Sequence, residues 1–170
     1  SYIFDSKGEK YLDFVAGISA CSLGHRHPEI IKAIKKQLNK FLHVMVYGEY
    51  VQEPTVKLCK KLASLLPKDL EVTFLTNSGT EAIEGAMKLA KRYTKKSNFI
   101  AAKNSYHGST QGALSLLGVK NQKEGYGPLL PKVNFIDFNS NKDLIKIDNN
   151  TAAVILETIQ GGAGFIIPKT

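Results

Sequence analysis

The apolar positions in the first third of the chain predict a hairpin followed by two helices. Short apolar runs at 2–4 and 11–14 flank a turn sequence, so a β-hairpin is expected to open the chain. Helical spacing then begins at Pro28, and it predicts an apolar stripe that should be buried: Ile30, Ile31, Ile34 and Leu38. A second helix is predicted from Glu53 to Leu66, where Pro67 ends it.

The stretch 76–82 joins a β-rich run, 71–76, to a long helical pattern. One face of that pattern is apolar and comprises Ile83, Ala86, Met87 and Ala90. Ser78 and Glu81 have capping-box spacing, so the helix is expected to start at Ser78. Gly79 allows a ligand to approach the backbone, and the first free N–H groups of the helix belong to Gly79 and Thr80. The stretch is therefore predicted to form an anion site, for which phosphate is the usual occupant. A well-capped helix without a ligand is the alternative.

The remainder of the chain alternates between strand and helix patterns. Strands are predicted at 99–102, 133–137 and 152–157, with a short helix at 110–117 and a weaker one at 142–147. This alternation predicts an α/β fold with a mostly parallel sheet and helices on both faces. The long segment between Gly118 and Pro131 is predicted to be a loop, and loops of that length are often functional.

Composition narrows the range of functions. The 18.7 kDa chain is 43% hydrophobic, which is ordinary for a globular protein. The net charge of +8 comes from lysines spread along polar helix faces, with Arg26 and Arg92 as the only arginines. Because nucleic-acid surfaces usually draw on arginine, we expect solvated faces and no nucleic-acid partner. No run approaches the length of a membrane span and no signal peptide is visible, so no membrane partner is expected.

Cysteine and histidine usage argues against a metal or disulfide framework. Cys21 and Cys59 form no CxxC pair, and two reduced core thiols in a cytoplasmic protein is the interpretation we favour. His25 and His27 lie two residues apart without a cysteine or acidic partner in sequence, which makes them poor metal ligands. No metal site is therefore predicted.

Three motifs occur together in a fixed order. They are Asn77-Ser78-Gly79-Thr80-Glu81-Ala82, Tyr106-His107-Gly108-Ser109-Thr110, and Glu157-x-x-Gln160-Gly161. In order and spacing this set resembles the class III aminotransferases, which are enzymes of fold type I that use pyridoxal 5′-phosphate (PLP). The resemblance covers essentially the whole chain. It implies an N-terminal segment over 1–50, the first part of the PLP-binding large domain over 51–170, and a homodimer.

The resemblance also implies which residues bind the cofactor. Gly79 and Thr80 match the phosphate-binding pair, with Ser78 as the cap. Tyr106, just before His107 and Gly108, matches the aromatic residue that stacks on the pyridine ring; a core tyrosine is the alternative. Glu157 matches a glutamate that lies under the cofactor; the alternative is a glutamate with a purely structural pairing at the end of a strand. Gln160, from the same loop, is a weaker candidate for cofactor binding. The expected cofactor-binding set is Ser78, Gly79, Thr80, Tyr106, His107, Gly108, Glu157 and Gln160.

The Schiff-base lysine that PLP chemistry requires has no match among the 21 lysines of this sequence. In the family, this lysine and the acid at the pyridine nitrogen would both follow Thr170. The chain lacks an initial Met and stops after a glycine-rich turn, so both ends look cut. We therefore expect no catalytic residue within 1–170 and assign transamination to the intact protein. The alternatives are an aminomutase or decarboxylase of the same family, or a non-catalytic phosphate-binding fragment.

Two positions depart from the acetylornithine, ornithine and 4-aminobutyrate branches of the family. Those branches carry an arginine that grips a substrate carboxylate where this chain has Ser109. They carry a glutamate that partners another arginine where this chain has Gly162. The departures put those specific activities in doubt. Transfer of an amino group from another amine or amino acid to an oxo acid remains the expected reaction. Tyr47 or Tyr50 could line a substrate pocket, although ordinary core or interface aromatics are favoured.

Overall fold

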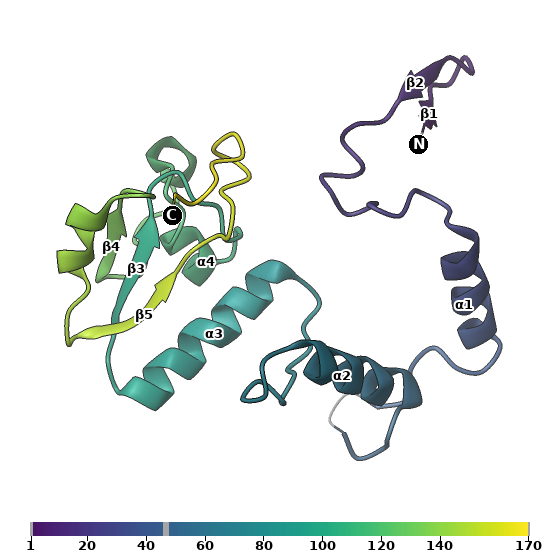
Figure 1. Cartoon of the computed structure of the whole chain (residues 1–170), viewed down its shortest axis with the longest axis horizontal. Helices are drawn as coiled ribbons and strands as arrows, with labels where there is room; N and C mark the ends of the chain where they lie inside the picture. Colours follow the sequence, from purple (N-terminus) through teal and green to yellow (C-terminus); the bar gives the residue numbers. More distant parts are fainter. Residues whose placement is uncertain (1, 46–47, 170) are drawn as a thin grey trace. The chain divides into compact units, whose positions relative to one another are not determined.

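The computed structural model describes residues 2–45 and 48–169 (Figure 1). The chain divides into two compact units with a boundary between Thr73 and Phe74. The resemblance places a different boundary after residue 50, between the N-terminal segment and the large domain of the family. That boundary stays a prediction.

The first unit contains the predicted hairpin and both predicted helices. Strands β1 (Tyr2–Phe4) and β2 (Lys10–Leu12) pair antiparallel, and Asp5 closes the turn by accepting the N–H groups of Lys7 and Glu9, each at 2.9 Å. Helices α1 (Pro28–Leu38) and α2 (Glu53–Leu65) each carry a proline in the first turn, where no intrahelical N–H bond is lost.

The predicted burial of the α1 stripe is wrong for this structure. Ile34 and Leu38 are about half exposed, and neither α1 nor α2 has a buried residue. Amphipathic spacing predicts which face is apolar, but burial also requires an element to pack against that face. Within the first unit, no described element does so.

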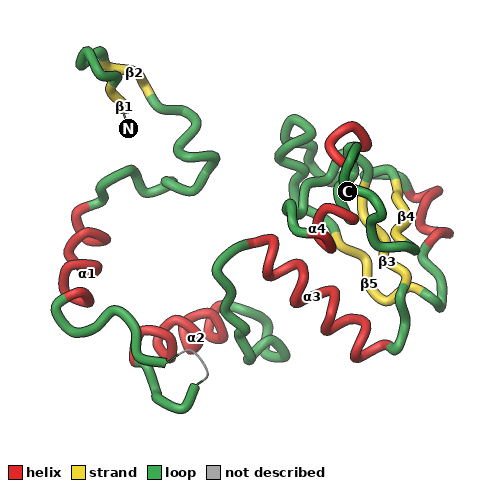
Figure 2. Tube along the Cα trace, turned by 180° about the vertical axis from the view of Figure 1, so that it is seen from behind, coloured by secondary structure: helices red, strands yellow, loops and turns green. Residues whose placement is uncertain are grey.

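The second unit is an α/β layer built on a three-stranded parallel sheet (Figure 1). Strand β3 (Asn98–Ala102) lies at the centre between β4 (Val133–Ile136) and β5 (Thr151–Ile155). Helix α3 (Gly79–Thr94) packs beside β5, and α4 (Gln111–Ser115) packs near α3. The 3₁₀ turns η1 (Lys120–Lys123) and η2 (Asn141–Lys146) lie in the connections, and long loops follow α4 and β5 (Figure 2). The predicted α/β class and parallel sheet are confirmed.

The core lies between α3 and the sheet. Met87, Phe99, Ala101 and Leu116 form its centre, and all of them are at most 3% exposed. Ile83 and Ala90 of α3 pack against this cluster, as the apolar face of the helix predicts, whereas Ala86 of that predicted face is exposed. The core thereby fixes the position of α3 on the sheet.

We expect Phe99→Ala to lower the free energy of unfolding of the intact protein by about 3–5 kcal/mol, because removing a buried ring leaves a cavity in close-packed surroundings. Phe99 is 1% exposed. Urea unfolding measures the loss, and Phe99→Leu is the matched control, which retains most of the volume and should lose less. A loss below about 1 kcal/mol for Phe99→Ala would contradict this account of the core.

Three local predictions need correction. Residues 71–76 form no strand, because strand propensity needs a pairing partner and none of the described strands offers one. The expected helix at 142–147 is the tighter 3₁₀ turn η2. Strand β5 ends at Ile155, so Glu157 lies in the loop beyond it.

Candidate cofactor site

The N-terminus of α3 is capped as its sequence predicts. The Ser78 Oγ accepts the N–H of Glu81 at 3.2 Å, and the Glu81 carboxylate reaches back to the N–H of Asn77 at 2.8 Å. The first intrahelical bond runs from the N–H of Ala82 to the carbonyl of Ser78. Within the described residues, the N–H groups of Gly79 and Thr80 therefore donate to no other group.

These two N–H groups form the anion-binding end of a 16-residue helix. A Cβ added at Gly79 would meet no atom within 4 Å, so no packed side chain covers the Cα of Gly79 beside these donors. The residues present thus fit a phosphate group, because unpaired main-chain N–H groups at a helix N-terminus are the donors that bind it.

The loop after β3 lies close against the start of α3. Gly108 has φ +128°, and a Cβ there would overlap the Thr80 side chain and come within 2.9 Å of the Thr80 Cα. Thr80 Oγ1 lies 2.7 Å from Thr110 Oγ1 and accepts the Thr110 N–H at 3.2 Å. The structure therefore brings the first and second sequence motifs together at the carboxyl side of the sheet, where α/β proteins place ligands (Figure 1).

Tyr106 and His107 differ in environment. The Tyr106 side chain is 54% exposed, which leaves its ring free to lie against a planar ligand, so the core alternative does not apply in this structure. His107 is buried, and its Nε2 has no partner among the described residues. Burial lowers the pKa of His107 although the charge of Glu157 opposes it, so the imidazole is neutral at pH 7.

Glu157 links the second motif to the third. Its Oε2 accepts the N–H of Tyr106 at 3.3 Å, and its Oε1 accepts the N–H of Gly161 at 3.4 Å. A single carboxylate therefore ties the aromatic loop to the loop after β5.

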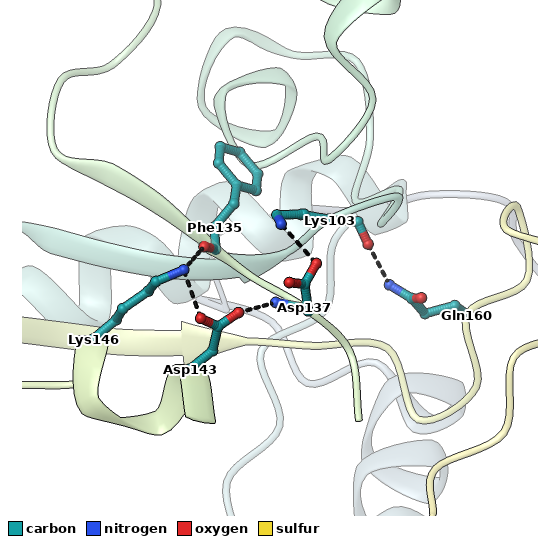
Figure 3. A network of polar contacts seen from close by, with 6 residues as sticks. All are labelled: Lys103, Phe135, Asp137, Asp143, Lys146 and Gln160. Carbon is teal, nitrogen blue, oxygen red and sulfur yellow. Dashed lines mark hydrogen bonds and ion pairs between the residues drawn. The ribbon is translucent and has the colours of Figure 1, made fainter. Parts of the chain in front are cut away.

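Gln160 is a structural anchor in this arrangement. It is 1% exposed, its amide donates to the carbonyl of Lys103 at 2.9 Å, and its backbone pairs with Ile166 in an antiparallel bridge. Figure 3 shows its side chain reaching the end of β3. The amide nitrogen of Gln160 thus donates a hydrogen bond to the protein's own backbone.

A polar network holds the carboxyl ends of β3 and β4 together (Figure 3). Lys103 Nζ lies 2.7 Å from Asp137 Oδ1, and the Asp137 N–H donates to Asp143 at 2.6 Å. Lys146 pairs with Asp143 at 2.8 Å and donates to the carbonyl of Phe135 at 3.1 Å. The hydrogen bond to Asp137 raises the pKa of Lys103, which keeps it protonated, whereas a nucleophilic amine requires the opposite shift.

Sequence reasoning gave no role to Thr110 or Glu84, although both join the site. Glu84 Oε1 accepts the Thr110 hydroxyl and two N–H groups of α4. The only available signal was that Glu84 follows Thr80 by four residues and so shares its face of α3.

Other residues considered from sequence belong to the first unit or lie outside the described residues. His25 pairs with Asp13 at 2.6 Å, and no group of three or more His, Cys, Asp or Glu within 2–45 and 48–169 is placed to hold a metal. Tyr50 is 60% exposed, and Tyr47 lies outside the described residues. Cys21 and Cys59 are free thiols, each partly buried. Among the described helices, none combines the length and apolar character that crossing a bilayer requires.

Comparison with known proteins identifies the family. The family described as Aminotransferase class-III matches residues 1–170. The chain belongs to the class III aminotransferases.

Relatives and solved structures agree with this assignment. The acetylornithine aminotransferase of Methanopyrus kandleri is 40% identical over 98% of this chain, and the [LysW]-aminoadipate semialdehyde/glutamate semialdehyde transaminase of Sulfolobus acidocaldarius is 41% identical over 97%. Among solved structures, a transaminase from the marine bacterium Virgibacillus matches 99% of the chain with a TM-score of 0.89 at 27% identity. The ornithine aminotransferase of Toxoplasma gondii also matches 99%, with a TM-score of 0.85 at 30% identity. The fold is that of these transaminases.

This class III chain spans less than half of the proteins it resembles. It covers 42% of both curated relatives, 42% of the Virgibacillus transaminase and 41% of the T. gondii enzyme.

Proposed function

We propose that the intact protein is a PLP-dependent aminotransferase that moves an amino group from an amine or amino acid to an oxo acid. The observation that carries this proposal is the pair of free N–H groups at Gly79 and Thr80, set beside Gly108, whose missing side chain allows the close approach. Family membership and the PLP at the active site of the T. gondii relative support it.

We assign the cofactor contacts by their positions in this arrangement. Gly79 and Thr80 would bind the phosphate, Ser78 would hold the helix end, and Tyr106 would lie on the pyridine ring. When bound, PLP supplies the electron sink for breaking bonds at the amine-bearing carbon of the substrate. Glu157 would fix the Tyr106 loop, while the buried His107, Gly108 and Gln160 would shape the wall around it.

We infer a protein of the cytoplasm that acts as a homodimer on small molecules, on the strength of the family resemblance. We also propose that 1–50 is an N-terminal segment and 51–170 the first part of the large domain. The aminomutase and decarboxylase alternatives are not favoured, because the relatives named above are transaminases.

The amino donor is a separate question, because Ser109 and Gly162 differ from the pattern of the acetylornithine and ornithine branches. We propose that no arginine at position 109 holds a donor carboxylate. A panel of amines and amino acids with 2-oxoglutarate or pyruvate as acceptor identifies the donor.

The proposed function is tested by trapping the cofactor in the intact protein. PLP is added, the protein is reduced with borohydride, and its mass and adduct-bearing peptide are determined. One modified lysine outside residues 1–170, together with amino transfer in the donor panel, would support the proposal. A unique adduct within residues 1–170, or no specific adduct, would overturn it.

Replacing Gly79 should separate folding from cofactor binding. We expect the free energy of unfolding of Gly79→Ala to equal that of the wild type or to exceed it by up to about 1 kcal/mol. The added Cβ meets no protein atom, and alanine favours the helix. PLP should bind about 10–100-fold more weakly, because the methyl group lengthens charge-assisted hydrogen bonds of about 1–3 kcal/mol.

The matched control is Gly85→Ala in the same helix, where the added Cβ would make an ordinary 3.7 Å contact with Phe74. It should bind PLP as the wild type does. Unchanged PLP affinity in Gly79→Ala, measured by fluorescence titration, would contradict the placement of the phosphate.

A further inference from the structure

The Glu84 carboxylate collects three donors at one oxygen. Its Oε1 accepts the Thr110 hydroxyl at 2.6 Å, the Gly112 N–H at 2.7 Å and the Ala113 N–H at 3.2 Å. Gly112 has no room for a side chain there, because a Cβ would overlap the Glu84 carboxylate. Glu84 thus joins α3 to the start of α4 by contacts far apart in sequence.

The protonation of this group determines the direction of the hydrogen bonds around it. Burial alone would raise the pKa of Glu84, but the hydrogen bonds from Thr110, Ala113 and Gly112 outweigh burial and hold it below its ordinary value. Glu84 is therefore ionised at neutral pH and can only accept hydrogen bonds. It follows that the single hydroxyl proton of Thr110 points at Glu84.

The direction of the next hydrogen bond follows from this one. Thr80 Oγ1 and Thr110 Oγ1 are 2.7 Å apart, and either could donate on distance alone. Because the Thr110 proton is used on Glu84, Thr80 must be the donor. Thr80 Oγ1 in turn accepts the N–H of Thr110.

The Ser78 hydroxyl, the second one at the start of α3, also donates its proton to a protein acceptor. Ser78 Oγ accepts the N–H of Glu81 and lies as donor 3.3 Å from the Glu81 carboxylate. Both hydroxyl protons beside the two free N–H groups are therefore directed to protein acceptors.

We infer that Glu84 is a positioning residue that, through Thr110, turns the Thr80 hydroxyl proton away from the anion site. The phosphate of a bound cofactor would then be held by main-chain N–H groups without a hydroxyl donor from Thr80. This inference rests on the proposed function for the identity of the anion. The hydroxyl chain itself is a property of the protein without cofactor.

The test compares Thr80→Val with Thr110→Val and the double variant in the intact protein. We expect the two single variants to bind PLP with affinities within about fivefold of each other, since neither removes a phosphate contact. In urea unfolding without cofactor, the double variant should lose less free energy than the two single variants combined, because both break the same link. A Thr80→Val affinity more than about fivefold below that of Thr110→Val would overturn the inference, because a lost charged hydrogen bond has that effect. Additive losses in unfolding would overturn it as well.

Variants of Glu84 test the direction of the chain. In a Glu84→Ala background the Thr110 proton is released, so the Thr80 hydroxyl becomes free to turn to the phosphate. Adding Thr80→Val to Glu84→Ala should then weaken PLP binding about tenfold. Adding it to Glu84→Gln should weaken PLP binding only slightly, because glutamine keeps an oxygen that accepts the Thr110 proton. Equal effects in both backgrounds would overturn the role of Glu84.

The two proposals fail in different ways. A wild-type protein that binds no PLP defeats the proposed function. The unfolding comparison, made without cofactor, still decides whether Thr80 and Thr110 act as one linked pair.

Discussion

Pyridoxal, which lacks the phosphate, should bind the intact protein roughly 10²–10⁴-fold more weakly than PLP. The phosphate is expected to accept the N–H groups of Gly79 and Thr80, and each charge-assisted bond contributes about 1.5–3 kcal/mol. Two such bonds correspond to about 3–6 kcal/mol, at about 1.4 kcal/mol for each tenfold change in affinity. The helix terminus adds further attraction for a dianion.

Competition titrations with the purified apoprotein measure this difference. Inorganic phosphate should compete with PLP for the site, and pyridoxal should need a roughly 10²–10⁴-fold higher concentration than PLP for the same occupancy. Gly85→Ala serves as the control variant and should show the wild-type ratio. If pyridoxal binds within about threefold of PLP, the α3 terminus is not the phosphate site, because even one lost charge-assisted bond of about 1.5 kcal/mol exceeds that ratio.

Gly108→Ala should lower the free energy of unfolding of the intact protein by roughly 2–6 kcal/mol. The left-handed φ of +128° costs about 1–3 kcal/mol for a residue with a side chain, and forced overpacking against Thr80 costs about 1–3 kcal/mol more. The atoms in the way include the Thr80 Cα, so a change of rotamer cannot relieve the overlap. Any retained fold must therefore move either the Gly108 loop or Thr80, whose N–H is one of the two proposed phosphate donors.

Chemical denaturation of the intact protein gives the loss, and Gly162→Ala is the control for it. Gly162 is exposed and has no atom within 4 Å of an added Cβ, so its variant should unfold within about 0.5 kcal/mol of the wild type. The same small loss for Gly108→Ala would show that the loop is not packed against α3 as described.

Local signals in the sequence predicted the helix terminus well. Ser78 and Glu81 are three residues apart, and the bond from the Glu81 N–H to the Ser78 Oγ follows from that spacing alone. The order of strands and helices after Phe74 likewise predicted a parallel sheet. These features depend on near neighbours and on general rules for connections.

Long-range pairing could not be predicted in the same way. Thr80 and Thr110 are 30 residues apart, and Glu84 meets Gly112 across 28 residues, so no spacing rule connects them. At 71–76 a local signal predicted too much. The β-rich composition of this run predicts a strand, but no described strand pairs with it. Ile34 of α1 has helical spacing but remains half exposed, because burial depends on what packs against a face.

The strand order β4-β3-β5 also has a consequence for biosynthesis. The central strand begins at Asn98, and its partner in β5, Thr151, leaves the ribosome 53 residues later. At roughly 5–20 residues per second, β3 waits roughly 3–10 s for that neighbour. During this interval Phe99 and Ile100, which end up 1% exposed, have no complete sheet to cover them. Nascent chains stalled between residues 102 and 151 should therefore be the most dependent on chaperones, well before a cofactor can bind.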